Sequence, residues 1–315
     1  MPCLIPWPKT PVGLILPEGN TFTMTRDEAL VTLLGPASHP HQPTLENYVA
    51  YQWRRQQDTL GYRSGCQRDA VILEWLEAAL QARNGPRALL DVGSAFGNHI
   101  FMLNARLKFD SDVSYQGIEI SGTHLDFARA FASEIGQYRN CQFADINAED
   151  PLPFDDGTFD AVNICDVLEH LARPDLTLNE LRRVTKAGGT LVLSTPQHRT
   201  VFKSLAREVN SLSQGRLYSR YYRGKDTELD RKGQPIMEHD AGHAHISEMQ
   251  IDELETKLVN AGWKVQEVRL MSVMSGSGWF DEHPLLLSGL MLLEAIHRAL
   301  RRPSWAHSFM VRATA

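Results

Sequence analysis

The chain has 315 residues, of which 43% are hydrophobic and 22% charged, so it can bury a core and is not an intrinsically disordered polymer. Its formal charge of −6 argues against non-specific binding to nucleic acid, which needs a basic face, so we expect no nucleic-acid partner. The four cysteines show no Cys-x-x-Cys spacing, and prolines interrupt the apolar start of the chain. Both features predict a reduced, cytoplasmic protein without a secretion signal.

Residues 1–85 are expected to form an N-terminal arm and a helical cap. The first part, 1–40, is rich in proline and glycine and is predicted to lie over the core. Two helices follow, at 44–60 and at 66–83, the second with one apolar face and a stop at Asn84-Gly85-Pro86. The second helix is expected to pack on a sheet, and the aromatic first helix either packs or lines a pocket.

A glycine turn organises the next part of the chain. The apolar run Ala88–Leu90 ends in Asp91, the small-residue turn Gly93–Gly97 follows, and apolar residues recur at helical spacing from Ile100. Glycine allows a sharp turn and a close approach of a ligand to the backbone. The helix that follows presents unpaired N–H groups at its start. By itself this strand, turn and helix would also suit a dinucleotide-binding domain.

Further apolar segments are predicted as strands: 115–120, 141–146, 152–165 and 186–195. The first two carry an acid near their ends, Glu119 and Asp145, as the strand before the turn carries Asp91. Alternating strands and helices require parallel pairing through right-handed crossovers. Because ligands of such sheets bind at the carboxyl ends of the strands, we expect the acids to gather at one binding edge.

This series resembles the class I S-adenosylmethionine-dependent methyltransferases, in the group related to ubiquinone and menaquinone biosynthesis, over about residues 87–197. The resemblance implies an α/β fold with a doubly wound, seven-stranded, mostly parallel sheet of the Rossmann-like methyltransferase type. The cofactor-binding domain would span 86–315, with insertions at 198–246 and 275–304. An NAD-binding domain would not explain the acids of the later strands.

Two positions depart from the family pattern. Ala95 stands where the turn usually has its middle glycine, which narrows the space for the methionine part of the cofactor. The sequence at 186–189 reads Lys-Ala-Gly-Gly where the family usually has Lys-Pro-Gly-Gly. Neither change removes the expected cofactor site.

The resemblance assigns roles in binding S-adenosylmethionine. Glu119 would accept both ribose hydroxyls, Asp145 would accept from the adenine amine, and Ile146 would meet the adenine ring. Asp91 and the turn would hold the methionine end. The full set of expected cofactor residues is Asp91, Gly93, Ser94, Gly97, Glu119, Ile120, Asp145, Ile146 and Asp166.

Asp166, Glu169 and His170 lie within one helical turn and are predicted to share a helix face. Three interpretations stay open. His170 could be a general base, the three side chains could hold a divalent metal, or the segment could simply close the cofactor pocket. Closure of the cofactor pocket is slightly favoured, and the metal site is the least favoured of the three.

The stretch after the fifth predicted strand is the least typical. Basic and aromatic residues at 216–225 either bind an anionic or sugar-bearing substrate or form a solvated face. The histidine run at 239–245 matches no standard metal spacing. Relatives often carry a similar segment facing the substrate, so His243 and His245 are expected to line the pocket.

The C-terminal part contains a helix at 249–261 capped by Ser247, a strand at 263–271, an apolar helix and a final antiparallel strand at 307–313. The apolar stretch 285–302 is short for a membrane span. It is expected to pack in the core, close the active site, lie on a membrane surface or form a dimer contact.

The sequence therefore predicts S-adenosylmethionine-dependent methyl transfer to a small-molecule substrate. We expect O-methylation of a small or saccharide-bearing molecule, with His170 or a histidine of the 239–245 run as base. The alternatives are N- or C-methylation of a natural product or lipid-linked intermediate, and a cofactor-binding regulatory protein without turnover.

Overall fold

The computed structural model describes residues 12–15, 21–24, 59–134, 138–212, 228–229, 235–236, 245–274, 280 and 282–315. The predicted helix at 44–60 falls outside the described residues except for its last two positions. Most of the arm at 1–40, the basic and aromatic stretch at 216–225 and His243 also lie outside them.

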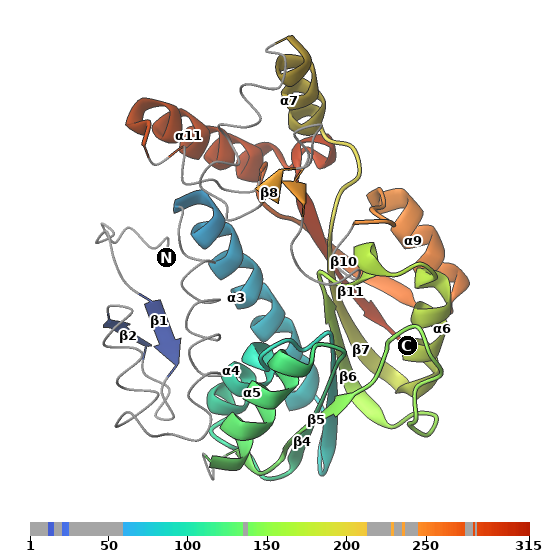
Figure 1. Cartoon of the computed structure of the whole chain (residues 1–315). Helices are drawn as coiled ribbons and strands as arrows, with labels where there is room; N and C mark the ends of the chain where they lie inside the picture. Colours follow the sequence, from blue (N-terminus) through green and yellow to red (C-terminus); the bar gives the residue numbers. More distant parts are fainter. Residues whose placement is uncertain are drawn as a thin grey trace.

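One sheet organises the described chain (Figure 1). Its strands are β3 (Arg87–Val92), β4 (Val113–Glu119), β5 (Cys141–Asp145), β6 (Phe159–Cys165), β7 (Thr185–Pro196), β10 (Lys264–Leu270) and β11 (Ser308–Thr314). Their order is β10-β11-β7-β6-β3-β4-β5. Strands β3 to β7 pair in parallel, while β11 runs antiparallel between β7 and β10. The predicted seven-stranded, mostly parallel sheet is confirmed.

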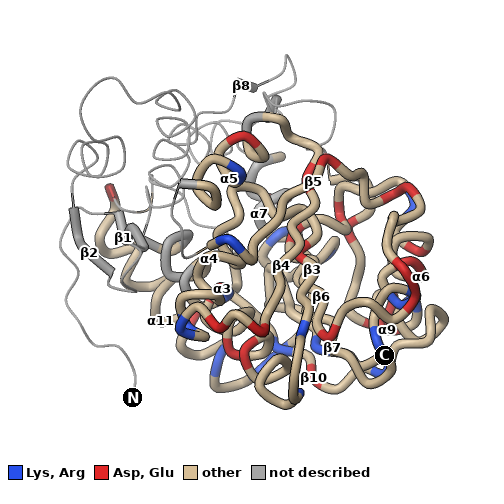
Figure 2. The backbone as a smooth tube through the Cα atoms, turned by 90° about the horizontal axis from the view of Figure 1, so that it is seen from below, with Lys and Arg blue, Asp and Glu red and all other residues tan. Residues whose placement is uncertain are grey.

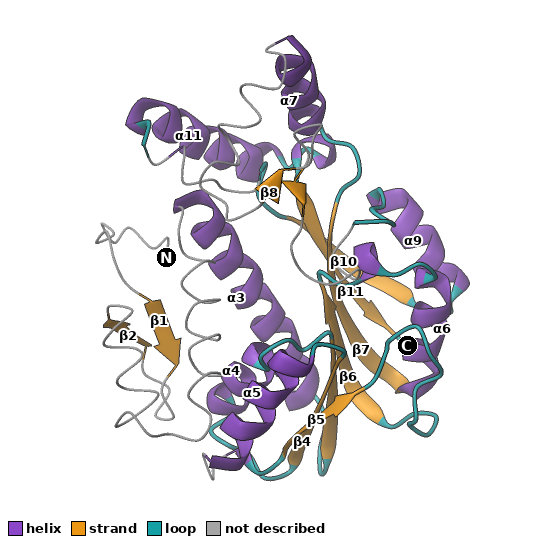
Figure 3. Cartoon of the chain, in the orientation of Figure 1, coloured by secondary structure: helices purple, strands orange, loops and turns teal. Residues whose placement is uncertain are grey.

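Helices cover both faces of this sheet (Figure 3). One face carries α3 (Thr59–Gln81), α4 (Asn98–Arg106) and α5 (Gly122–Glu134), and the other carries α6 (Pro174–Val184) and α9 (Ile251–Asn260). Each face has its own buried core: Ile72, Ile100 and Phe127 belong to the first, and Leu181 and Leu254 to the second. Burial on both faces explains why five of the seven residues of β6 are apolar.

Helix α3 is the predicted helix at 66–83, but it begins at Thr59 and ends at Gln81. Glycines at 61 and 65 are poor helix formers and hide its start in the sequence. Trp75 of α3 is only 2% exposed, and the guanidinium of Arg269 on β10 lies 4.8 Å from its ring centre. Arg269 also pairs with Glu74 at 3.0 Å. These contacts fix α3 across the sheet.

The remaining elements extend from this core. They are β1 (Val12–Ile15) paired with β2 (Thr21–Met24), the short turn η2 (Leu168–His170), α7 (Val201–Leu212), β8 (Glu228–Leu229) paired with β9 (Pro235–Ile236), α11 (Pro284–Leu300) and η3 (Pro303–Trp305). Helix α11 lies between β10 and β11 in the chain, and α7 and α11 stand at one end of the molecule (Figure 1). Among the described helices, none has the length and apolarity to cross a bilayer.

The predicted cap of the helix at 249–261 is wrong. The helix, α9, begins at Ile251 with Gln250 before it, and Ser247 does not cap it. The Ser247 hydroxyl instead donates to the carbonyl oxygens of Leu168 and Leu171, at 2.8 and 2.7 Å. A serine before an apolar helix predicts a cap, but here the hydroxyl bonds to the loop after β6.

Charged residues of both signs are interspersed along the described chain (Figure 2).

Candidate functional site

The predicted acids lie at the carboxyl ends of neighbouring strands. Asp91 of β3 is in register with Gly117 of β4 and Asn163 of β6, and Glu119 is in register with Asp145 of β5. The parallel pairing therefore brings them to the same edge of the sheet, where ligands of such sheets bind.

The turn between β3 and α4 depends on its two glycines. Gly93 has φ +65°, and a Cβ there would lie 2.3 Å from Cγ2 of Val167. Gly97 has φ +79°, and a Cβ would lie 2.7 Å from the Phe101 ring. Any larger residue would displace these neighbours and strain the backbone. Ala95, at φ 46°, adopts the left-handed conformation that glycine normally supplies.

Asp91 lies under this turn and is 1% exposed. One carboxylate oxygen accepts a hydrogen bond from Asn163 at 2.7 Å, and the other, Oδ2, is buried without a hydrogen-bond partner among the described residues. Burial raises the pKa of Asp91, although His99 and Asn163 oppose the shift. The Ser94 hydroxyl is likewise buried without a described partner. Both oxygens could accept from a ligand with N–H groups.

Glu119 connects the end of β4 to the turn. Its carboxylate accepts from the backbone N–H groups of Ala95, Ile120 and Ser121, at 2.9, 2.8 and 3.0 Å. Burial raises the pKa of Glu119, but the His124 ring, whose Nδ1 lies 4.0 Å from Oε2, and the N–H groups of Ser121 and Ala95 outweigh burial and lower it. A carboxylate has about four acceptor positions, so one donor can join these three bonds, and a second must displace one of them.

An apolar surface lies beside Glu119. Ile120 is 60% exposed, although isoleucine usually avoids water, and Ile146 beyond β5 is half-buried. Asp145 is exposed beside Ile146. These side chains offer an apolar contact and an acceptor at the predicted adenine position.

The predicted helix face of Asp166, Glu169 and His170 is wrong. Strand β6 ends at Cys165, Asp166 adopts a left-handed φ of 55°, and the turn η2 contains only Leu168–His170. Asp166 therefore points elsewhere: it accepts from the Ser194 hydroxyl at 2.7 Å and pairs with Arg68 of α3.

Helix α3 supplies site residues that sequence reasoning missed. Besides Arg68, it places Asp69 with an oxygen 3.3 Å from Nε2 of His99, the second residue of α4. The other ring nitrogen of His99 lies 3.4 Å from the Asn163 amide. The position of His99, two residues after the glycine turn, was a usable signal, but nothing local in the sequence indicates the partners from α3.

A second cluster lies beside η2. Glu169 is 1% exposed and accepts from the Thr195 hydroxyl at the end of β7, at 3.0 Å. Burial, aided by the negative charge of Asp166, raises the pKa of Glu169 to about 7. The rings of His170 and His245 meet at nearly right angles, with centres 4.9 Å apart.

Backbone hydrogen bonds hold His245 in this cluster. The next two residues, Ile246 and Ser247, both donate their N–H groups to the carbonyl oxygen of Glu169, at 2.8 and 3.0 Å. The Ser247 hydroxyl adds the two bonds described above. The segment that carries His245 is thus fixed to the loop after β6.

Glu248 is a residue of this cluster that sequence reasoning missed. Its carboxylate lies 2.9 Å from Nδ1 of His245, and Nζ of Lys203 donates to both of its oxygens, at 3.0 and 3.2 Å. Burial alone would raise the pKa of Glu248, but the His245 hydrogen bond and the Lys203 charge lower it to about 2. The pKa of His245 is raised, chiefly by the hydrogen bond with Glu248.

One set of three potential metal ligands occurs among the described residues, and Asp166 is not part of it. Ligand atoms of Glu169, His170 and His245 lie within 4.8 Å of one another, and Glu169 Oε1 and His170 Nε2 are 4.0 Å apart. Ligands at about 2.1 Å from a tetrahedral zinc ion are roughly 3.4 Å apart. The set is therefore wider than such a site, and we assign no metal to it.

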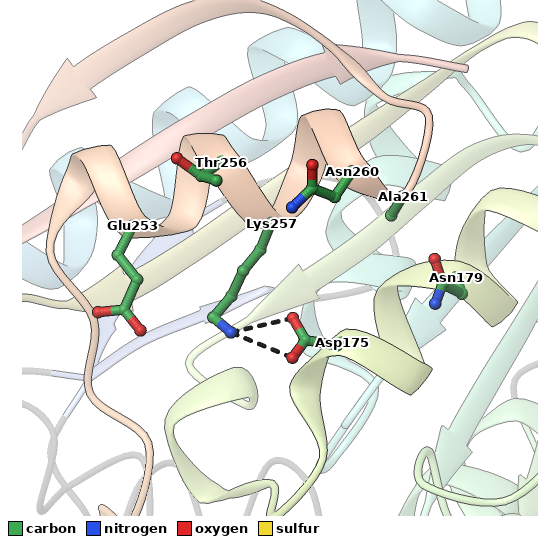
Figure 4. A pocket seen from close by; sticks show the side chains of 7 residues that line it. All are labelled: Asp175, Asn179, Glu253, Thr256, Lys257, Asn260 and Ala261. Atoms are coloured by element: carbon green, nitrogen blue, oxygen red, sulfur yellow. Dashed lines mark hydrogen bonds and ion pairs between the residues drawn. The ribbon is translucent and has the colours of Figure 1, made fainter.

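A surface hollow of about 430 Å³ lies elsewhere, between α6 and α9 (Figure 4). The ion pair of Lys257 and Asp175 spans it, at 3.0 Å. It contains no predicted site residue, so we assign it no role.

Comparisons with known proteins agree with this geometry. The model of a family described as "Methyltransferase domain" matches residues 86–254. The chain is 30% identical over 119 residues to ajmaline N-methyltransferase of Rauvolfia serpentina, covering 38% of this chain and 39% of that protein. It is 31% identical over 123 residues to the ubiquinone/menaquinone biosynthesis C-methyltransferase UbiE of Sinorhizobium fredii, covering 38% and 46%. The matched region thus spans less than half of each relative.

Solved structures share the fold. The chain superposes on a geranyl diphosphate methyltransferase in complex with GPP and sinefungin with a TM-score of 0.50, at 15% identity and 78% coverage of each chain. It superposes on phosphoethanolamine N-methyltransferase 2 of Haemonchus contortus, in complex with S-adenosyl-L-methionine, with a TM-score of 0.52. That match has 14% identity and covers 91% of this chain and 60% of the other.

Proposed function

Because the chain belongs to the methyltransferase domain family, we propose that it transfers a methyl group from S-adenosylmethionine to a small-molecule acceptor. The family and its fold give S-adenosylmethionine as the cofactor of this domain. The observation that carries the proposal is the pair of buried acceptors, Asp91 Oδ2 and Ser94 Oγ, that lack described partners beside the glycine turn.

The edge residues fit the parts of this cofactor. Asp91 and Ser94 would accept from the ammonium of the methionine end, to which the turn offers a close backbone approach. Glu119 would accept from the ribose, and Ile146, with the exposed Ile120 beside it, would meet the adenine ring. Because three backbone bonds already occupy Glu119, a two-hydroxyl contact requires the release of one of them. The remaining members of the proposed cofactor set are Gly93, Gly97, Asp145 and Asp166.

When bound, S-adenosylmethionine supplies a methyl group already activated as part of a sulfonium. The protein contributes by holding the acceptor in line with that methyl group, which removes much of the entropic barrier. An acceptor with an O–H or N–H also has to lose a proton, and His170 and His245 are the ring bases proposed for that step. We propose O-methylation of a small or saccharide-bearing molecule. The alternative is N- or C-methylation.

Calorimetric titration with S-adenosylmethionine, S-adenosylhomocysteine and NAD tests the cofactor assignment. We expect binding of the first two near 1 μM, about −8 kcal/mol, and no binding of NAD. The substitution Glu119→Ala should weaken binding at least tenfold, because it removes the ribose acceptor and the bond that holds the turn. Glu253→Ala, at an acid in the first turn of α9, is the matched control and should leave binding unchanged.

Binding of NAD alone would overturn the proposal. Release of S-adenosylhomocysteine in the presence of a panel of phenols, sugars and amines would separate an enzyme from a regulatory protein that binds the cofactor without turnover.

A second proposal concerns α11: we propose that this helix rests on an anionic lipid surface. Leu285, Leu292 and Leu300 are 92%, 62% and 53% exposed and lie on one side of the helix at helical spacing. Arg298 and Arg301 are exposed at its C-terminal end. An exposed apolar stripe followed by arginines complements a negatively charged membrane surface.

A further inference from the structure

The proposed function leaves open which of the His170 and His245 rings is the base, and it gives Glu248, which lies 2.9 Å from Nδ1 of His245, no role. We infer that His245 is the base that takes the acceptor's proton and that Glu248 is the positioning residue that holds its ring. This inference rests on the proposed methyl transfer and deepens it, since it restricts the acceptor to a molecule that loses a proton during the reaction.

The hydrogen bond between the two side chains fixes the state of the ring. Glu248 stays ionised at neutral pH because its pKa is lowered to about 2, so its oxygens can only accept. The ring nitrogen 2.9 Å away, Nδ1 of His245, therefore carries the hydrogen. In the neutral ring Nε2 is then the free acceptor. A carboxylate at Nδ1 both orients such a ring and increases its basicity.

Glu248 is itself held in place. Nζ of Lys203 donates to both of its oxygens, and Nδ1 of His198 lies 3.7 Å from Oε2. The Glu248 side chain is 17% exposed, whereas that of His245 is 40% exposed. The Glu248 carboxylate is thus shielded, as suits a group that orients the ring. The His245 ring is open to a substrate, as a base has to be.

The pair lies close to the strand edge that carries the proposed cofactor residues. The carbonyl of Glu169 anchors the two residues after His245, and Glu169 follows β6, which pairs with β3 and its Asp91. The charged and titratable groups around the His245 ring are Glu169, His170, Glu248 and Lys203, with His198 beyond Glu248. The His170 ring packs against the His245 ring.

The chemical step balances with these residues. The acceptor oxygen or nitrogen forms a bond to the methyl carbon as the carbon–sulfur bond breaks, and the electron pair of that bond stays on sulfur. The acceptor's proton passes to Nε2 of His245. The resulting imidazolium is balanced by the negative charge of Glu248, and solvent later removes the proton.

The test measures the pKa of His245 by NMR titration of histidine ring signals in the full chain, with the His245→Gln variant to assign the signal. Glu248→Gln keeps the hydrogen-bond acceptor but removes the charge. It should lower the pKa of His245 by about one unit. Lys203→Met removes a nearby positive charge and should raise the same pKa, and this opposite shift does not depend on how Glu248→Gln folds. Glu253→Gln should change neither.

A comparison of the His245 pKa in two complexes tests whether the ring lies near the methyl group. S-adenosylmethionine and S-adenosylhomocysteine differ by one positive charge at sulfur, so a base facing that sulfur should have a lower pKa in the first complex, by roughly half a unit. His283, the residue before α11, serves as the distant reference and should show no difference.

An unchanged pKa of His245 in Glu248→Gln, or equal values in the two complexes, would overturn the inference. Binding of Zn²⁺ that His245→Gln abolishes would assign the ring to a metal instead and would overturn it too. Calorimetry on the same samples separates this failure from that of the proposed function, because the cofactor should bind normally to every variant of the pair.

Discussion

Ala95 is strained in a turn that otherwise uses glycine for left-handed conformations. At φ 46° its Cβ crowds the backbone, which costs about 1–2 kcal/mol for an L-residue. Ala95→Gly removes this strain but adds conformational entropy to the unfolded chain, worth about 0.5–1 kcal/mol. We therefore expect a net stabilisation of about 0.5–1 kcal/mol, measured by urea unfolding. The matched control, Ala105→Gly within α4, should destabilise the protein. An equal loss of stability in both variants would show that Ala95 is not strained.

The buried carboxyl of Glu169 predicts a pH dependence of stability. Its pKa is raised from 4.5 to about 7 in the folded chain, so the folded state binds the proton more tightly than the unfolded state. This contribution to stability is fully present below pH 4.5 and is lost as the pH rises through 7. The loss is up to about 3 kcal/mol.

Glu169→Gln keeps the shape of the side chain and cannot titrate. We expect its free energy of unfolding, measured in urea from pH 4.5 to 8, to fall less with rising pH than that of the wild type. Glu253→Gln is the control for an exposed acid and should follow the wild type. A Glu169→Gln curve parallel to the wild type would show that the carboxyl is already ionised when folded.

Helix α11 gives a prediction at the scale of an element. Replacing Leu285, Leu292 and Leu300 together by glutamine removes its exposed apolar stripe. Wild-type protein should float with vesicles that contain phosphatidylserine and less with pure phosphatidylcholine, and the triple variant with neither. Leu176→Gln, at an exposed leucine of α6, should float like the wild type. A wild-type dimer that the triple variant breaks would assign the stripe to a second copy.

The elements that the sequence predicted well share one physical property. Strands such as β3 and β6 are buried on both faces and read as apolar runs, so their positions and order followed from composition and turns. The loop after β6 failed because regular helical spacing was assumed for Asp166, whose left-handed bend turns it toward Arg68. Its partner lies 98 positions away in the chain, a distance at which no local pattern carries information.

The residues of the candidate site divide in the same way, into those that a local pattern reveals and those that depend on distant segments. The positions of Asp91 and Glu119 near the ends of strands were predicted correctly, because the pattern of apolar residues reveals where each strand ends. Glu248 was missed although it follows His245 by three positions, since its role depends on Lys203 from a different segment. Residues placed by the sheet are predictable from sequence, and residues recruited by packing between distant segments are not.

At the scale of the whole molecule, the order of the strands in space differs from their order in the chain. Strand β11 pairs with β7 on one side and β10 on the other, although it follows both in the chain. Strand β10 is the edge of the described sheet, and β11 is its neighbour there.

This order has a consequence for biosynthesis. When β10 leaves the ribosome, the strand that will join it to the sheet has not yet emerged, so a nascent chain holds the parallel strands with the outer edge of β7 open. An open apolar strand edge is a template for pairing with other chains. Newly made copies are thus most exposed to aggregation and chaperone capture in the interval between the emergence of β7 and that of β11.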